Sequence, residues 1–363
     1  MKFNLILYSF IAIITSVVIS SCTDKTDLSQ FPITNNGGQV NVSETLYVQQ
    51  SPTWNQFNQP SAVLVGREPL VYVADTKNNR VVQMDLSGLE IGSIDIKNPI
   101  ALAQDYNFDL LVIGDSVLNI TNDTISILYR IKLTEAKNPG VISTALLLPL
   151  IGSDFATPLT SRKRRFTGIG IFSNNSYVVT RRGPDNISSL DPDNAILKIT
   201  GRNSVSSVVT LSGFQPAGNG IYSIDKLSGI STFNNERTDF ILIRNTPDFG
   251  FKVEWFLFND LKGTYDPKFL PGDNVDILNK QLESPSGITV DPNKNVFIID
   301  ASRDSLYKYT SGGRLRSESF GGTGSGENQL RNPKGVSFFN KVLYIADTGN
   351  NRIVRYKLST DLN

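Results

Sequence analysis

The sequence predicts an all-β repeat protein, either a propeller or a solenoid, from a repeated motif, its constant spacing and its alternating hydropathy. The stretch YIADTGNNRIVRY, starting at Tyr344, recurs near the other end of the chain as VYVADTKNNRVVQM, starting at Val71. A proline stands fifteen residues before Asp75 in the early copy and fourteen before Asp347 in the late copy. Apolar runs of period two, separated by turn residues, are typical of β-strands. A repeat of some tens of residues is typical of propellers and solenoids.

These stretches resemble the NHL repeat, and the resemblance implies one four-stranded propeller blade for each copy. Weaker copies lie between the two strong ones, so six units can be assigned. Their first strands are expected to start near Pro60, Pro99, Thr167, Ser228, Pro285 and Pro333. The expected fold is therefore a six-bladed β-propeller spanning residues 43–363, with insertions at about 134–165 and 259–279.

The sixth unit has no room for an outermost strand, because its third strand ends near Leu358 and few residues follow. The segment Ser43 to Gln50 has the right alternation and stands ahead of the first unit as an outermost strand would. We therefore expect an N-terminal strand to complete the last blade. Closure of this kind removes free sheet edges.

The N-terminus reads as a lipoprotein signal peptide over residues 1–21, with an apolar run that ends in small residues. The last residues before Cys22 are Ile19-Ser20-Ser21, which resemble the bacterial lipobox and imply lipidation of Cys22. The alternatives are an uncleaved anchor or a plain signal peptide. Residues 22–42 are rich in small polar types and are expected to form a flexible tether. The expected location is the bacterial cell envelope, facing the periplasm or on the cell surface.

Composition excludes several classes of function. Lys and Arg total 35 against 34 for Asp and Glu, so a net charge of +1 gives no overall attraction to nucleic acid. The chain contains no histidine, which rules out histidine-dependent serine triads and histidine-held zinc. Its single cysteine rules out a disulfide within the chain.

Two aspartate and arginine pairs are predicted to staple turns: Asp75 with Arg80, and Asp347 with Arg352. Each pair spans five residues across a tight turn, where a carboxylate can accept backbone amides and bind a guanidinium. The alternative is an acidic ring that also binds a cation. Departures from the motif argue against six equivalent sites, because Thr180 and Arg244 stand where aspartates are expected in the third and fourth units.

Basic residues gather in the turns and linkers that a propeller places on one face. The predicted patch, a candidate site for an anion or a partner, consists of Arg162, Lys163, Arg164, Arg165, Arg181, Arg182 and Arg244. A cluster of cations on a nearly neutral protein would attract a negative ligand. The alternative is a set of solvated loop charges with no ligand.

The sequence favours a lipid-anchored binding or scaffolding protein over an enzyme. The expected partner is an envelope protein, a peptide or a glycan, and the expected contact with the membrane is the N-terminal lipid. An export signal argues against nucleic acid. The alternative is a calcium-dependent lactonase-like enzyme or another hydrolytic propeller enzyme without histidine, with calcium as the only cofactor in question. No catalytic residue and no metal ligand can be assigned, and the oligomeric state stays open.

Overall fold

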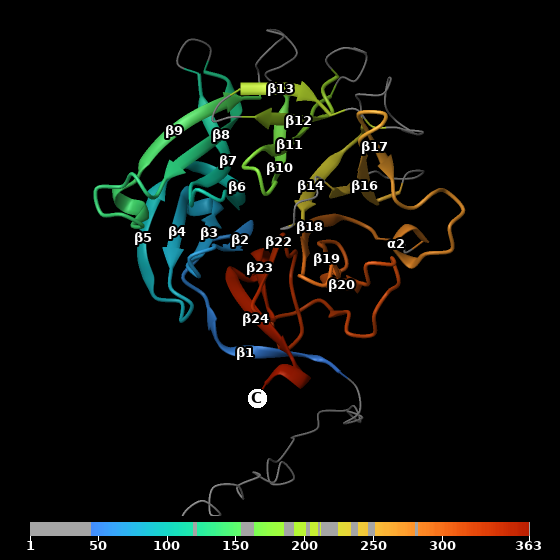
Figure 1. Ribbon diagram of the computed structural model, residues 1–363. Helices are drawn as coiled ribbons and strands as arrows, with labels where there is room; N and C mark the ends of the chain where they lie inside the picture. Colours follow the sequence, from blue (N-terminus) through green and yellow to red (C-terminus); the bar gives the residue numbers. More distant parts are fainter. Residues whose placement is uncertain are drawn as a thin grey trace, which may run out of the picture. The chain divides into compact units, whose positions relative to one another are not determined.

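Six four-stranded antiparallel sheets surround a common axis, so the protein is a six-bladed β-propeller, as the repeats predict (Figure 1). The computed structural model describes residues 45–118, 122–153, 163–184, 192–200, 204–209, 211, 224–233, 239–245, 251–279 and 282–362, with backbone alone at 204–208. The predicted signal peptide, Cys22 and the tether lie outside the described residues. None of the helices in the described ranges is long and apolar enough to cross a membrane.

The first three blades follow the chain, each from its innermost strand to its outermost. Blade 1 contains β2 (Ala62–Val65), β3 (Val71–Asp75), β4 (Arg80–Met84) and β5 (Glu90–Asp95). Blade 2 contains β6 (Lys97–Gln104), β7 (Leu110–Val117), β8 (Thr124–Lys132) and β9 (Leu146–Gly152). Blade 3 contains β10 (Arg165–Ile171), β11 (Tyr177–Arg182), β12 (Ala195–Thr200) and β13 (Ser204–Val208).

The second half of the ring has the same order. Blade 4 contains β14 (Leu227–Thr232), β15 (Phe240–Arg244), β16 (Val253–Asn259) and β17 (Thr264–Pro267). Blade 5 contains β18 (Pro285–Val290), β19 (Val296–Asp300), β20 (Ser305–Tyr309) and β21 (Phe320–Gly321). Blade 6 contains β22 (Gly335–Phe339), β23 (Val342–Asp347), β24 (Arg352–Leu358) and β1 (Tyr47–Trp54). The short helices are η2 (Thr76–Asn78), η3 (Ile142–Thr144), α2 (Asp276–Asn279), η5 (Thr348–Asn350) and η6 (Ser359–Asp361).

The N-terminal strand closes the ring. β1 runs antiparallel to β24, with Tyr47 opposite Leu358 and Gln50 opposite Arg355 (Figure 1). This arrangement confirms the predicted closure, although the strand covers Tyr47–Trp54 and so lies slightly later in the chain than expected. The first and last segments of the propeller therefore share one sheet, in which β24 is paired on both sides.

The two predicted insertions are corrected by the structure. The stretch 134–165 contains β9, and the stretch 259–279 contains β17, so each supplies the outermost strand of its own blade. Neither stretch carries the repeat motif, because an outermost strand is exposed and packs on one neighbour only. β9, for example, has one buried residue among seven.

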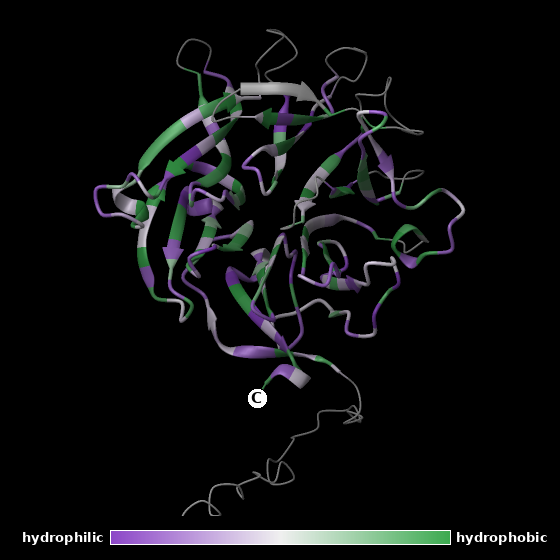
Figure 2. Ribbon diagram, in the orientation of Figure 1, coloured by the Kyte–Doolittle hydropathy of each residue, from purple (hydrophilic) through white to green (hydrophobic). Residues whose placement is uncertain are grey.

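The hydrophobic core lies between the blades. Buried apolar side chains of the described residues form six clusters, each between two neighbouring blades. Figure 2 shows hydrophobic residues concentrated in the blade strands and many hydrophilic residues in the connecting loops. Each blade therefore buries its two faces against its two neighbours around the closed ring.

Candidate functional site

A channel follows the propeller axis and consists of three cavities in series. We call the end where the innermost strands begin the proximal mouth, and the end where they finish the distal mouth. The proximal mouth encloses about 430 Å³, the waist about 100 Å³ and the distal mouth about 440 Å³. Both mouths fall in the size range of small-molecule sites, which is roughly 300–1,000 Å³.

Two rings of side chains separate the three cavities. The ring between the proximal mouth and the waist consists of Ser61, Ile100, Thr167, Ser228, Ser286 and Lys334. The ring between the waist and the distal mouth consists of Val63, Leu102, Ile169, Ile230, Ile288 and Val336. The first ring is mostly polar and the second is entirely apolar. A polar ligand therefore meets favourable partners at the proximal end and an apolar constriction beyond them.

A small residue stands between the two rings in every blade, because neighbouring innermost strands approach closely at the waist. A Cβ added to Gly287 would lie 2.3 Å from the carbonyl oxygen of Lys334, and one added to Gly335 would lie 2.7 Å from that of Ser61. Only glycine fits at such backbone contacts.

The proximal mouth is lined mainly by amides and hydroxyls. Its polar uncharged residues are Ser61, Asn98, Ser126, Thr167, Ser228, Asn245, Ser284, Ser286, Ser302 and Asn332. The charged residues of this lining are Asp115, Arg165, Arg182 and Lys334. Three cations against one carboxylate make this cavity positive on a nearly neutral protein.

Several of the amides and hydroxyls are held in place by neighbours. Asn98 Nδ2 donates to Asp115 Oδ2 at 2.8 Å, and Asn245 Nδ2 donates to Ser284 Oγ at 3.1 Å. Ser126 is 1 % exposed, and its Oγ has no hydrogen-bond partner within the described ranges. A buried hydroxyl without a partner is uncommon in proteins, and here it belongs to the wall of a polar cavity.

Arg165 and Arg182 face each other across the β10 and β11 ladder. The Arg165 guanidinium donates to the carbonyl oxygens of Thr124 at 2.9 Å and Arg164 at 2.7 Å. Arg182 and Lys334 are exposed, and neither forms an ion pair with a described residue. Arg182 and Lys334 therefore present their charges to the cavity and to solvent.

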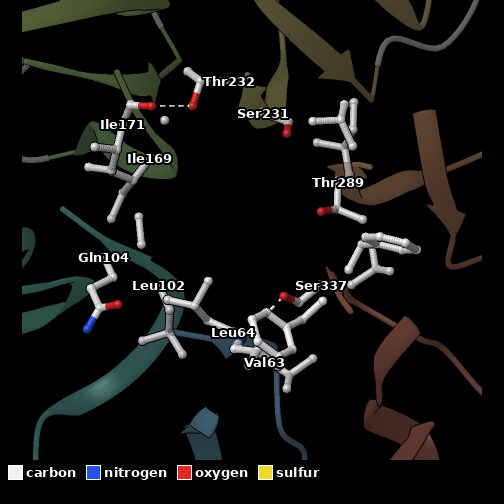
Figure 3. Close-up of a pocket in the computed structure, with 18 of the residues that line it drawn as sticks. Val63, Leu64, Leu102, Gln104, Ile169, Ile171, Ser231, Thr232, Thr289 and Ser337 are labelled. Atoms are coloured by element: carbon white, nitrogen blue, oxygen red, sulfur yellow. Dashed lines mark hydrogen bonds between the residues drawn. The ribbon is translucent and has the colours of Figure 1, made fainter. Parts of the chain in front are cut away.

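The distal mouth has a different chemistry (Figure 3). Its hydroxyls come from blades 4 to 6 and are those of Ser231, Thr232, Thr289 and Ser337, while blades 1 to 3 contribute mostly apolar side chains such as Leu64 and Leu102. Thr232 Oγ1 donates to the Ile171 carbonyl at 2.6 Å. Arg67, the only charged residue of this lining, has its guanidinium carbon 3.4 Å from the ring centroid of Tyr106.

The predicted basic patch does not form as one surface, because three of its members are buried inside blades. Arg164 Nε donates to Asp193 Oδ1 at 2.6 Å, and Arg181 Nη2 donates to the carbonyl oxygen of Pro192 at 2.7 Å. Arg244 Nη1 donates to Glu254 Oε2 at 2.8 Å. Each of these arginines is at most 2 % exposed, so none of the three is available to an external anion.

The pairing register of β10 with β11 shows which residue of blade 3 occupies the aspartate position of the repeat. Gly168 pairs with Thr180, whereas Gly335 pairs with Ala346, because the hairpin of blade 3 is one residue longer than that of blade 6. The residue at the aspartate position of blade 3 is therefore Arg181 rather than Thr180, which corrects the alignment read from the sequence.

At the equivalent position of blade 4, Arg244 also binds the segment that leads into its blade, but as a hydrogen-bond donor instead of an acceptor. Asp347 Oδ1 accepts from the backbone N–H of Arg331 in the segment leading into blade 6, at 2.8 Å. Arg244 Nε instead donates to the backbone carbonyl of Asp225, in the segment leading into blade 4, at 3.1 Å. The fold itself therefore accounts for Arg244.

The remaining predicted cations separate into three groups. Arg162 lies outside the described residues. Lys163 is exposed but does not line the proximal mouth. Arg165 and Arg182 do line it, and Lys334, which the sequence analysis missed, joins them. The repeat could have indicated Lys334, because Lys334 follows Pro333 as Ser61 follows Pro60 and Ser286 follows Pro285.

The predicted turn pairs lie away from the lining of the mouth. Arg80 Nε donates to Asp75 Oδ2 at 2.9 Å, and Arg352 Nε donates to Asp347 Oδ2 at 2.7 Å. Both aspartates are fully buried. These contacts hold the turn between the second and third strands of their blades.

Two buried carboxylates outside the channel, Asp105 and Asp109, share one arginine as their partner. Asp105 and Asp109 both accept from Arg130 Nη1, at 2.6 Å and 2.9 Å. Burial raises the pKa of Asp109, and the Arg130 guanidinium opposes that rise. Within the described ranges, no group of three or more acidic or cysteine side chains could hold a metal ion.

Comparison with known proteins shows the fold alone. No family model matches the chain, and no curated protein sequence matches it. Similar solved structures include an auxiliary nutrient binding protein from Bacteroides ovatus, with 12% identity over 87% of this chain and 78% of that one, and a TM-score of 0.56. A gluconolactonase from Xanthomonas campestris has 10% identity over 87% and 97%, with a TM-score of 0.53. The PQQ-bound aldose sugar dehydrogenase from Streptomyces coelicolor has 13% identity over 87% and 99%, with a TM-score of 0.52.

Proposed function

We propose that this chain is a lipid-anchored binding protein of the cell envelope, an NHL-type propeller whose proximal face engages a protein, peptide or glycan. The observation that carries the proposal is the proximal mouth, a cavity lined by amides and hydroxyls with Arg165, Arg182 and Lys334 at its wall. Such a lining can orient a polar ligand through many hydrogen bonds. Binding proteins and enzymes share this fold, so the choice between the two functions has to be argued from the residues of the site.

The chemistry of the site favours binding over the calcium-dependent alternative. Ca²⁺ takes six to eight oxygen ligands and is usually held by several carboxylates. Among the residues lining the proximal mouth, Asp115 is the only carboxylate, and three cations share the cavity with it. A divalent cation would be repelled there, whereas an anionic group would be attracted.

The membrane anchor rests on the lipobox-like sequence that ends at Cys22. In the full-length precursor, Cys22→Ala should release the protein from membranes into the soluble fraction. The measurement is partition into detergent, with Ser20→Ala as a control that keeps the cysteine. Equal partition of the Cys22→Ala variant and the wild type would refute lipid anchoring.

The binding face can be located by photo-crosslinking in intact cells. A photoreactive amino acid at Ser302 samples the proximal mouth, and one at Thr289 samples the distal mouth of the same channel. The proposal expects a specific adduct from position 302. Adducts from position 289 alone, or from neither position, would contradict it.

Charge dependence gives the second part of the test. Affinity for the crosslinked partner should fall in Arg182→Ser and as salt rises, because exposed charges are screened over about 8 Å at physiological ionic strength. Lys163→Ser is the matched control, since Lys163 is an exposed cation that does not line the mouth. Equal losses in the two variants would mean that net charge, and not the mouth, governs binding.

A further inference from the structure

We propose that the proximal mouth binds the end of an acidic saccharide, a sugar unit that carries one carboxylate and several hydroxyls. This inference rests on the proposed function, because it names the ligand class of the same site. Its evidence is the combination of three cations, one fixed carboxylate and a dense set of amides and hydroxyls around a single cavity.

The cations call for a negative group on the ligand. Arg182 is an exposed cation of the lining that forms no ion pair with a described residue. Lys334 brings a third positive charge to a ring whose other members carry none. A carboxylate bound between Arg182 and Lys334 would form charge-assisted hydrogen bonds, which are about twice as strong as neutral ones.

The rest of the lining calls for hydroxyls on the ligand. Asp115 is a hydrogen-bond acceptor held by Asn98, and Ser126 Oγ has no partner among the described residues although it is buried. Asn245 and Asn332 add amides that can both donate and accept. A sugar ring presents several hydroxyls of this dual character. Asp115 would at the same time repel a ligand with many negative charges, such as a polyphosphate or a nucleic acid.

The channel limits how far the ligand enters. Beyond the polar ring, the waist encloses only about 100 Å³ and ends at the apolar ring that includes Leu102 and Ile288. A hydroxylated ligand gains nothing by passing an apolar ring, because its polar groups would lose their hydrogen bonds to water. The mouth therefore suits a terminal sugar unit that enters end-on, with the remainder of the glycan outside.

The test is calorimetric titration of the full-length protein in detergent with trigalacturonate, neutral galactotriose and inorganic phosphate. The proposal expects trigalacturonate to bind at least tenfold more tightly than the other two. The double variant Arg182→Ser with Lys334→Ser should lose at least tenfold in affinity for trigalacturonate. Equal affinity for the acidic and neutral trisaccharides, or tighter binding of phosphate, would overturn the inference.

Control variants separate the mouth from general charge and from the channel as a whole. Lys163→Ser removes an exposed cation outside the cavity, and Thr289→Val removes a hydroxyl from the distal mouth. Both should bind trigalacturonate as the wild type does, and a loss in either of them that equals the loss in the double variant would refute the assignment. A proximal crosslink to a partner that no acidic saccharide displaces would end this inference and leave the proposed function standing. Absence of both binding and crosslink would end both.

Discussion

Asn351 in blade 6 accepts a hydrogen bond on Oδ1 from the backbone N–H of Gln59, at 2.9 Å, although 292 positions separate the two residues. Asn351 has a left-handed backbone, with φ of 57°, and this conformation directs its side chain to the segment that leads into blade 1. The same contact joins two more pairs of blades, through Asn79 and Asn98 and through Asp304 and Asn332. The turn of one blade thus binds the segment leading into the next.

Substitution of Asn351 should weaken the ring closure. Asn351→Ala loses the hydrogen bond to Gln59, worth about 0.5–1.5 kcal/mol, and places alanine in a left-handed conformation that costs roughly 1–2 kcal/mol. We expect a loss of about 2 kcal/mol in the free energy of unfolding, measured by denaturant titration. Asn351→Gly keeps the conformation accessible and should lose only about 1 kcal/mol. Equal stability of all three proteins would show that this contact does not hold the ring.

Removal of the Asp347 carboxylate should be more damaging, because it leaves three donors without an acceptor. Asp347 accepts from the Arg331 backbone at 2.8 Å, from Asn350 Nδ2 at 2.8 Å and from Arg352 Nε at 2.7 Å. Breaking a buried pair from one side costs about 3–5 kcal/mol, which is the loss expected for Asp347→Ala in thermal or denaturant unfolding.

Blade 5 supplies a control for this prediction. Arg303 Nε lies 3.9 Å from Asp300, and the Arg303 side chain is 42% exposed. Arg303→Ala should therefore change the free energy of unfolding by less than about 1 kcal/mol. Intact stability in Asp347→Ala, together with lost binding, would assign Asp347 to a ligand site instead of the turn.

The N-terminal strand should contribute through its buried residues. Tyr47 is 3% exposed, and its ring centroid lies 6.3 Å from that of Phe297 and 5.6 Å from that of Phe320. Tyr47→Ala should cost about 3–5 kcal/mol, as large aromatic truncations in cores do. Val48→Ala, at the next and exposed position, should cost less than about 0.5 kcal/mol. A wild-type melting temperature for Tyr47→Ala would contradict closure by β1.

Stability above pH 8 should depend on Lys268. Burial, with a smaller effect of Lys294, lowers the pKa of Lys268 to about 8 from its ordinary 10.5, while the ammonium donates to the Ser311 carbonyl and lies 3.4 Å from the Trp255 ring centroid. Between these two pKa values the unfolded chain holds a proton on Lys268 that the folded chain lacks, so the contribution of Lys268 to the free energy of unfolding should rise with pH. Lys268→Met should abolish that rise in melting curves. Parallel pH profiles of the two proteins would disprove the pKa assignment.

The repeated strands could be predicted from the sequence because their signals are local. The motif around Asp75 and its copy around Asp347 carry alternation, turn residues and spacing that depend on neighbours in the chain. β9 and β17 escaped prediction because outermost strands face solvent on much of their surface and need no strict pattern. These two segments become strands because they pair with the third strands of their blades, β8 and β16.

By itself the sequence determined the number of blades, the ring closed from the N-terminus and the absence of histidine chemistry, since each follows from composition or local pattern. Tertiary structure alone decided which cations line the proximal mouth. Successive residues of a strand point to opposite faces, so Arg181 is buried while Arg182 reaches the proximal mouth. Whether a buried guanidinium is satisfied depends on acceptors elsewhere in the chain, as Glu254 is for Arg244. Charge can be read from residue types, but burial and partners arise only when the blades pack.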